Sequence, residues 1–395
     1  MIDTKFSPWP SFSEEEVEAV KRVLLSNRVN YWTGSECVKF EDEFATFTDS
    51  KYAIALANGT VALDLAFKSL GITSGDEVIV TSRTFMASVS SIVNAGAVPI
   101  FVDVNRNTQN VDVDTIKGSV NQKTKAIICV HLAGWPCDMD PIMNLAKHYD
   151  LFVIEDCAQA HGAKYKGKPV GSIGHVGAWS FCQDKIMSTG GEGGMVTTND
   201  HELWSKMWSY KDHGKSYEAV FKQRDHSSGF RWLHGSFGTN WRMTEMQAVL
   251  GRIQITRMAE WNKIRRKNAE LIWSAANATI NLRVPDYRCE GCHNCYDSQH
   301  GCVNAAYKCY VFVNGDRAMR DHYLLEINKR GVPCFSGTCS EVYLEKAFDG
   351  TGWRPEKPLP TAHELGNTSL AFLCHPSLKQ EEINLTCRVI TEVCS

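Results

Sequence analysis

Five short apolar runs, spread over residues 52–157, constrain the fold of this chain more than any other feature. They read YAIALA, DEVIVTS, VPIFVDV, KAIICVHL and LFVIEDC. The gaps between them leave room for helices, and nearly continuous apolar runs are typical of strands that are covered on both faces. This alternation predicts an α/β fold in which right-handed crossovers join a mainly parallel sheet.

The pattern changes after residue 255 and predicts a second, smaller domain. A long amphipathic helix is expected over residues 252–275, and a polar, cysteine-rich insertion follows at 288–303. The next segments, AYKCYVFV, DRAMRDHYLLEINKRG and VPCFSG, indicate a strand, a helix and a strand. We therefore expect a large domain over residues 1–255 and an α+β C-terminal domain over 256–395.

The charge balance and the N-terminal segment exclude several classes of partner. The formal net charge is -3, which favours binding neither to nucleic acid nor to an anionic membrane. The N-terminus, MIDTKFSPWPSFSEEEVEAV, lacks the basic region and apolar core of a signal peptide. No apolar run approaches the ~20 residues that a bilayer span requires. We expect a cytoplasmic protein with no nucleic-acid or membrane partner.

Several apolar runs are followed by polar residues, at the sheet edge where α/β proteins bind ligands. Gly59 and Thr60 open a predicted helix whose free amides suit an anion, although Thr60 or Asn58 could simply cap that helix. Asp156 could bind a metal, a ribose or a protonated nitrogen, or cap the next turn. Phe85 either packs in the core or stacks on a planar ligand.

A dense glycine cluster follows Lys185 in the block SFCQDKIMSTGGEGG, which begins at Ser180. The block is no Walker A loop, because its lysine does not follow a glycine and precede Ser or Thr. The lysine could be solvated, clamp a phosphate or act as a nucleophile. Along one sheet, the chain thus offers an anion site, an aromatic ring, a carboxylate and a lysine. That set matches the requirements of pyridoxal phosphate.

These motifs resemble the DegT/StrS family of nucleotide-sugar aminotransferases. The likeness continues through TGSECVKFEDEFA, GDEVIVTSRTFMAS, HLAGWPCDMD, IEDCAQAHGAKYKGKPVGSIG, GTNWRMTEMQAVLGRIQI and CSEVYLEKAF. It implies the fold type I of pyridoxal-phosphate-dependent transferases, the aspartate aminotransferase fold. In that fold, helices flank a mainly parallel sheet in the large domain, and the C-terminal domain is smaller and α+β.

The resemblance also implies roles for single residues in binding pyridoxal phosphate. Lys185 matches the Schiff-base lysine, and Asp156 matches the partner of the pyridine nitrogen. Gln159 matches a residue at the oxygen side of the ring, and Phe85 matches the stacking aromatic.

The cofactor's phosphate has its own matched residues. Gly59, Thr60 and Ser180 correspond to a phosphate cradle within one subunit. Asn240 corresponds to a residue that reaches the phosphate of the neighbouring subunit. The resemblance therefore implies a homodimer whose active sites are shared across the interface.

The implied reaction converts a nucleotide-linked keto-sugar to an amino sugar, with glutamate as the amino donor. Within this class we favour a UDP-4-keto-6-deoxy-hexosamine aminated at C4, for a surface polysaccharide such as lipopolysaccharide or for a glycan. One alternative is a pyridoxal-phosphate-dependent 3-dehydratase of keto-deoxy sugars, but such enzymes carry histidine where this chain has Lys185. Another is a non-catalytic regulatory protein, which would be expected to lose Lys185 or Asp156.

The chain departs from the family pattern at Lys308, where histidine is common. This lysine could face a phosphate of the nucleotide sugar or simply be solvated.

A cysteine cluster lies just upstream, with the spacing C-x2-C-x2-C-x6-C: Cys289, Cys292, Cys295 and Cys302. Four thiolates can hold zinc or an iron–sulfur cluster, and His293 or His300 could replace one of them. The spacing matches neither the common zinc-finger nor the ferredoxin pattern. A reduced or partly disulfide-bonded loop is the competing interpretation.

Overall fold

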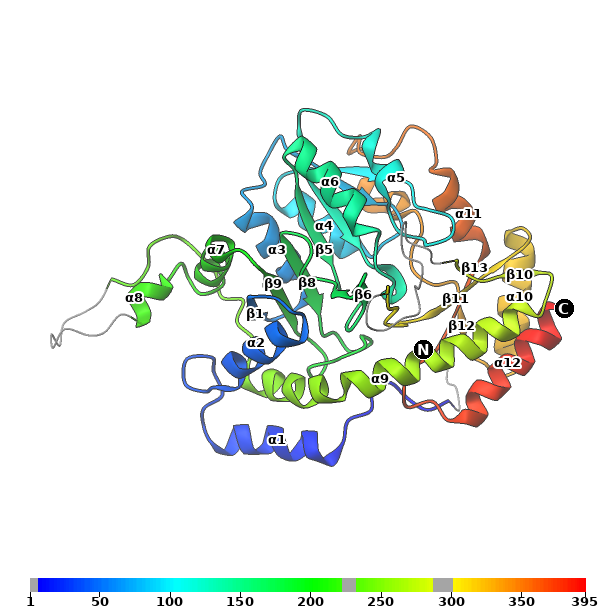
Figure 1. Cartoon of the computed structure of the whole chain (residues 1–395), viewed down its shortest axis with the longest axis horizontal. Coiled ribbons are helices and arrows are strands. Elements are labelled where there is room, and N and C mark those ends of the chain that lie inside the picture. Colours follow the sequence, from blue (N-terminus) through cyan, green and yellow to red (C-terminus); the bar gives the residue numbers. More distant parts are fainter. Residues whose placement is uncertain (1–5, 222–231, 287–300) are drawn as a thin grey trace.

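The computed structural model describes residues 6–221, 232–286 and 301–395, and its largest sheet has seven strands in the order β1-β9-β8-β5-β4-β2-β3 (Figure 1). The strands are β1 (Tyr52–Leu56), β2 (Glu77–Thr81), β3 (Val98–Val102), β4 (Thr124–Val130), β5 (Phe152–Asp156), β8 (Val176–Ser180) and β9 (Gly194–Thr198). The five predicted runs are β1 to β5. Within this sheet only β9 runs against the others, pairing antiparallel with β1 and with β8. The mainly parallel sheet is confirmed.

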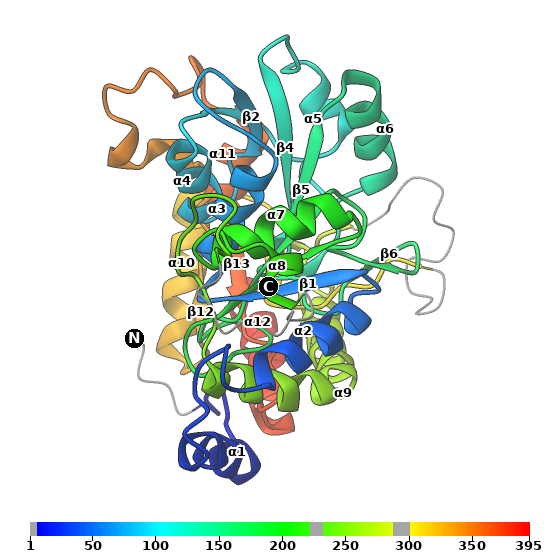
Figure 2. The ribbon, with the colours of Figure 1, turned by 90° about the vertical axis from the view of Figure 1, so that its left-hand side faces the viewer.

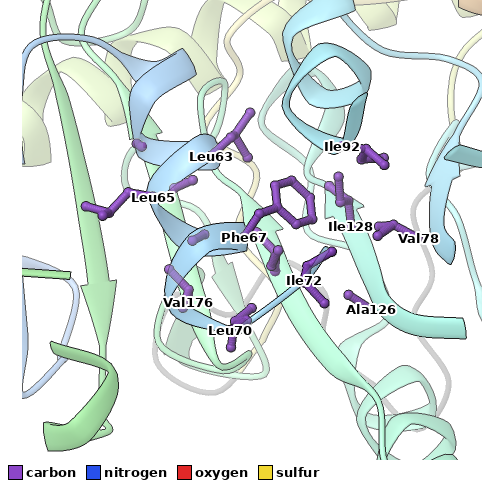
Figure 3. Close-up of a cluster of buried hydrophobic side chains, with 14 of the residues drawn as sticks. Leu63, Leu65, Phe67, Leu70, Ile72, Val78, Ile92, Ala126, Ile128 and Val176 are labelled. Atoms are coloured by element: carbon purple, nitrogen blue, oxygen red, sulfur yellow. The ribbon is translucent and has the colours of Figure 1, made fainter. Parts of the chain in front are cut away.

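Helices cover both faces of this sheet because its strands are apolar on both sides. In β1, Ile54 and Leu56 pack in one cluster, whereas Ala53 and Ala55 pack in another on the opposite face. The first cluster lies under α3 (Gly59–Ser69), α4 (Met86–Asn94) and α7 (His201–Lys211). Figure 3 shows part of it, with Phe67 of α3 turned toward the sheet. The opposite face is covered by α2 (Glu36–Phe47), α6 (Met139–Tyr149) and α9 (Glu245–Asn277).

The C-terminal part builds a second sheet of four antiparallel strands, in the order β10-β11-β13-β12. These are β10 (Leu282–Arg283), β11 (Cys309–Val313), β12 (Cys334–Phe335) and β13 (Ser369–Phe372). The predicted strand, helix and strand correspond to β11, α10 (Arg317–Lys329) and β12. Helix α12 (Gln380–Cys394) lies beside α9, as Figure 1 shows.

The helix expected over residues 252–275 is longer than its apolar pattern suggested, since α9 is continuous from Glu245 to Asn277. The side chain of Thr244 caps its first turn, accepting from the Gln247 amide at 3.4 Å. The expected domain division at 255/256 falls within this helix, and that boundary stays a prediction.

The remaining elements are shorter or lie outside the layers described above. They are α1 (Glu14–Leu25), α5 (Val113–Lys117), α8 (Tyr217–Phe221), α11 (Pro360–Thr368), β6 (Lys164–Tyr165) and β7 (Lys168–Pro169), with single 3₁₀ turns at Leu132–Gly134, Val342–Leu344 and Lys346–Phe348. Helix α11 packs on the second sheet through Ala362 and Leu365. Helix α8 projects from the body at the left of Figure 1 and points toward the viewer in Figure 2. No helix in the described ranges has both the length and the apolar character of a membrane span.

Candidate active site

A cavity of about 660 Å³ lies at the carboxyl ends of β2, β4, β5 and β8. The predicted site residues in its wall are Gly59, Thr60, Phe85, Asp156, Gln159, Ser180, Lys185 and Lys308. Parallel strands bring these residues together because their carboxyl ends share one edge of the sheet. Asn240 is exposed, and it is not among the described residues that line this cavity.

One end of the cavity is formed by the N-terminus of α3. The Asn58 side chain caps this helix by accepting from the Val61 amide at 3.0 Å, so the cap is Asn58 and not Thr60. The amides of Gly59 and Thr60 have no acceptor within the helix, which makes them suitable for an anion. A Cβ at position 59 would lie 2.5 Å from Ser180 Cβ, so glycine is required for this close approach.

Asp156 ends β5 and is 7% exposed in the wall of the cavity. Its Oδ1 accepts from the Ala158 amide at 3.1 Å, and its Oδ2 accepts from Ser88 Oγ at 2.8 Å. Because the Ser88 proton points to Asp156, the hydroxyl of Thr84 donates to Ser88 at 2.9 Å. Asp156 therefore caps the following turn with one oxygen, as one interpretation expected, and still presents its carboxylate to the cavity.

Sequence reasoning missed Ser88 as a partner of Asp156. The available signal was its place in the first turn of α4, four residues after Thr84 and so close to the sheet edge where Asp156 ends its strand.

Lys185 extends into the cavity, and 17% of its side chain is exposed. Its Nζ lies 3.5 Å from Asp184 Oδ1 and 5.4 Å from the centre of the Tyr307 ring. Its backbone carbonyl accepts from the indole Nε1 of Trp9 at 2.7 Å. The hydroxyl of Tyr307 donates to Asp184. Contacts from the N-terminal and C-terminal parts of the chain therefore hold the loop that carries the lysine.

Asp184 and Lys308, the charged residues near Lys185, both have a lowered pKa. Burial alone would raise the pKa of Asp184, but the nearby Lys185 ammonium, the Tyr307 hydroxyl and the Lys308 ammonium lower it overall. Burial lowers the pKa of Lys308, although Asp184 partly opposes that shift. Asp184 and Tyr307 were not singled out from the sequence, and their positions next to Lys185 and Lys308 were the only local signal.

Phe85 and Gln159 both line the cavity, and they differ in exposure and in hydrogen bonding. Phe85 stands just before α4 and is 69% exposed, so it is not a core residue within this chain. Gln159 uses its Oε1 to accept from the Ala133 amide at 2.8 Å, which fixes the orientation of its amide group.

This cavity fits pyridoxal phosphate in its donor set. A glycine-lined helix N-terminus suits the phosphate, and a buried carboxylate oriented by Ser88 suits a protonated ring nitrogen. Lys185 provides the amine that a pyridoxal aldehyde requires. The exposed ring of Phe85 adds an aromatic surface for a planar group.

The predicted cysteine cluster is only partly described. Cys289, Cys292 and Cys295 lie outside the described residues, as do His293 and His300. Cys302 is buried, and its Sγ accepts from the Lys166 amide at 3.4 Å. The metal site therefore stays a prediction.

A buried His131–Glu155 pair lies on the side of β5 opposite Asp156. His131 Nδ1 accepts from the Cys137 amide at 3.0 Å, so Nε2 donates to Glu155 Oε2 at 2.9 Å. Burial by itself raises the pKa of Glu155, but the bond from His131 and the amides of Gly171 and Gly174 outweigh it and lower the pKa. With Cys157 this pair forms a group of potential metal ligands, but its hydrogen bonds already give it a structural role.

Comparisons with known proteins match nearly the whole chain. The model of the DegT/DnrJ/EryC1/StrS aminotransferase family matches residues 10–392. GDP-perosamine synthase of Escherichia coli O157:H7 is 42% identical over 273 residues, covering 69% of this chain and 71% of that protein. Spore coat polysaccharide biosynthesis protein SpsC of Bacillus subtilis is 32% identical over 397 residues, covering 97% and 95%. The crystal structure of an aminotransferase from Psychrobacter cryohalolentis superposes with a TM-score of 0.93, at 60% identity and 98% coverage of both chains.

Proposed function

The chain belongs to the DegT/DnrJ/EryC1/StrS aminotransferase family, and we propose that it transfers the amino group of glutamate to a nucleotide-linked 4-keto-6-deoxy sugar. It is a pyridoxal-phosphate-dependent aminotransferase of the nucleotide-sugar class. The observation that supports the proposal is the single cavity that combines Lys185, Asp156 and the N-terminus of α3.

Different residues of the cavity would bind different parts of the cofactor. The amides of Gly59 and Thr60, together with Ser180, would bind its phosphate. Asp156 would hold its ring nitrogen in the protonated state, and Phe85 would cover the ring. Bound pyridoxal phosphate supplies an aldehyde carbon that exchanges amines and a ring that accepts electrons.

Lys185 has two tasks in this proposal. Its Nζ would hold the cofactor covalently, and when free it would take the proton from the α-carbon of the amino donor. In the second half of the reaction, Nζ would donate a proton to the sugar carbon that then carries the amino group. In the structure, Asp184 Oδ1 lies 3.5 Å from this nitrogen and would help to position it at the cavity.

The exact substrate is the most specific part of the proposal. From the sequence we favour a UDP-linked 4-keto-6-deoxy-hexosamine aminated at C4, for a surface polysaccharide or glycan made in the cytoplasm. The name of the Escherichia coli relative contains GDP, so GDP-linked sugars belong in the test as well.

A homodimer with shared active sites is also part of the proposal. Asn240, the residue expected to bind phosphate, is exposed and lies outside its own chain's cavity. Large apolar side chains in the segment between α7 and α9 that also contains Asn240 are exposed: Phe221 by 60% and Phe237 by 99%. A second copy of this chain would cover these side chains and bring Asn240 to the partner's cavity.

A panel assay tests the proposal. Purified holoenzyme is incubated with glutamate and with UDP-, GDP- or dTDP-linked 4-keto or 3-keto sugars, and products are identified by mass spectrometry. We expect the keto group of a 4-keto sugar to be replaced by an amino group, with an equal amount of 2-oxoglutarate formed. Loss of a hydroxyl group without amination would instead indicate the dehydratase, although the presence of Lys185 argues against it.

A further inference from the structure

Residues 6–9, near the N-terminus, lie against the C-terminal part of the chain and form what we call the N-terminal strap. The ring of Phe6 packs against the hydrophobic cluster around the second sheet. The amide and the hydroxyl of Ser7 donate to Oε1 of Glu382, at 2.6 and 3.2 Å. Glu382 lies in the first turn of α12, so this end of the strap is bonded to the last helix of the chain.

A second attachment fixes the backbone of the strap directly before Trp9. The hydroxyl of Ser377 donates to the carbonyl of Pro8 at 2.6 Å. Because its proton is used in this bond, Ser377 accepts from Nδ1 of His375 at 2.9 Å. Burial, together with the nearby Arg265, lowers the pKa of His375 to about 3. The ring is therefore neutral at pH 7, and its one proton lies on Nδ1.

The indole of Trp9 is held in one orientation by three side chains. It stacks on His375 with the ring centres 5.9 Å apart, and it makes an edge-to-face contact with Trp261 at 5.1 Å. The guanidinium carbon of Arg265 lies 4.8 Å from the centre of the Trp9 ring. A ring that is packed in this way has little freedom to turn, so the direction in which its Nε1 donates is fixed.

The indole Nε1 of Trp9 donates to the backbone carbonyl of Lys185 at 2.7 Å. Lys185 lies in the loop between β8 and β9, where its amide donates to Cys182 and the amide of Gln183 donates to Gly191, both at 3.0 Å. Those two bonds are internal to the loop. The bond from Trp9 instead connects the loop to the strap, and through the strap to the C-terminal part of the chain.

We propose that Trp9 is a positioning residue for Lys185, and that the N-terminal strap sets the place of this lysine relative to the second sheet. The inference rests on the proposed function for what Lys185 does, but the effect on the loop can be measured without turnover. Since Nζ moves with the backbone that carries it, a displaced carbonyl displaces the amine. A displacement of about 1 Å at a reacting group can cost on the order of 100-fold in rate.

Trp9→Phe tests the proposal because it keeps an aromatic ring and removes only the Nε1 donor. Hydrogen exchange, followed by mass spectrometry of the full-length protein, should show faster exchange in the peptide that contains residues 182–187. In the holoenzyme, the glutamate half-reaction should slow about three- to tenfold, the size expected for one lost hydrogen bond, with the KM for glutamate unchanged.

Trp261→Phe is the matched control. It removes an indole N–H from the same aromatic cluster, but the donor to Lys185 stays in place. Exchange in residues 182–187 and the half-reaction rate should both equal those of wild type.

Ser377→Ala tests the other end of the strap, since Ser377 is not among the described residues that line the cofactor cavity. It should slow the half-reaction in the same direction as Trp9→Phe and by a smaller factor. If the strap acts as a unit, the double variant should be slowed by less than the product of the two single factors. This variant also decides the question if Trp9→Phe does not fold.

The outcomes separate this inference from the proposed function. Faster exchange with a slower half-reaction in Trp9→Phe supports it, and faster exchange supports its structural part even if no keto-sugar is aminated. Unchanged exchange, or faster exchange with a wild-type half-reaction rate, overturns it. A change in KM alone would show that Trp9 shapes the donor's binding site and does not position Lys185. Effects of Trp9→Phe and Ser377→Ala that simply multiply would overturn the role of the strap as a unit.

Discussion

The hydroxyl of Ser88 donates a 2.8 Å hydrogen bond to Oδ2 of Asp156, and both residues are almost fully buried. Ser88 lies in the first turn of α4, whereas Asp156 ends β5, so the bond links two elements across the sheet edge. It orients the carboxylate that the proposed chemistry places against the cofactor's ring nitrogen. Predictions for both residues follow from this pair.

Asp156→Asn should retain the cofactor and lose turnover. A neutral amide cannot stabilise a positive ring nitrogen as a carboxylate does, and each ~1.4 kcal/mol lost in the transition state costs tenfold in rate. We expect the rate of the glutamate half-reaction to fall at least ~100-fold, measured by stopped-flow absorbance of the bound cofactor. A rate near wild type would assign the role to another group.

Ser88→Ala should have a smaller effect of the same kind. A hydrogen bond to a charged group is worth roughly 1.5–3 kcal/mol, and Asp156 Oδ1 keeps its bond from Ala158 in the variant. We expect about a tenfold slower half-reaction with little change in the KM for glutamate. If KM alone changes, Ser88 shapes the binding site and does not position Asp156.

Lys185→Ala should abolish covalent attachment of the cofactor while keeping the fold. In wild type, borohydride reduction followed by peptide mass spectrometry should place the cofactor on the peptide that contains Lys185. The variant should show no such adduct and an unchanged circular dichroism spectrum. Lys147→Ala, an exposed change on α6, is the matched control and should retain the adduct. An adduct that persists in Lys185→Ala would disprove the assignment.

Subunit mixing should show whether Asn240 acts across an interface. In a two-fold dimer with shared sites, a hybrid of Lys185→Ala and Asn240→Asp protomers contains one site with both changes and one intact site. Asn240→Asp should be nearly inactive alone, because its carboxylate would repel the cofactor's phosphate. An equal mixture should recover about one quarter of wild-type activity, since half of the dimers are hybrids.

The mixing experiment requires proof that subunits exchange, for example by native mass spectrometry of differently tagged protomers. If hybrids form and no activity returns, Asn240 does not complete the partner's site.

Acid stability should depend on Glu155. Its pKa in the folded protein lies below the ordinary value of 4.5, so its stabilising contribution is complete above pH 4.5 and disappears as the pH falls through the lowered pKa. Glu155→Gln should lower the melting temperature at neutral pH, since a hydrogen bond to a charged group is worth roughly 1.5–3 kcal/mol and the carboxylate accepts several. Below pH 4.5 the wild type should lose stability more steeply than this variant.

The control for acid stability is Glu260→Gln, which changes an exposed carboxylate on α9. Its melting temperature should follow that of wild type at every pH. Parallel curves for wild type and Glu155→Gln across the acid range would show that other carboxylates dominate acid unfolding.

Much of the fold followed from the sequence alone. The strands β1 to β5 were predicted because residues buried on both faces of a sheet leave continuous apolar runs, a pattern that local sequence preserves. Gly59, Asp156 and Lys185 could be grouped because parallel strands bring their carboxyl ends to one edge. Both inferences depend on short-range patterns and on a general rule of topology.

The tertiary structure decided the contacts that connect distant parts of the chain. Nothing local indicated that Tyr307 would donate to Asp184, or that Trp9 would donate to the backbone of Lys185. Such contacts form only when the N-terminal segment and the second sheet pack against the first. That packing depends on the shape of whole surfaces, which hydrophobic periodicity does not specify. For this protein, the sequence therefore determined which residues meet at the sheet edge in one cavity, and tertiary packing decided the surroundings of Lys185.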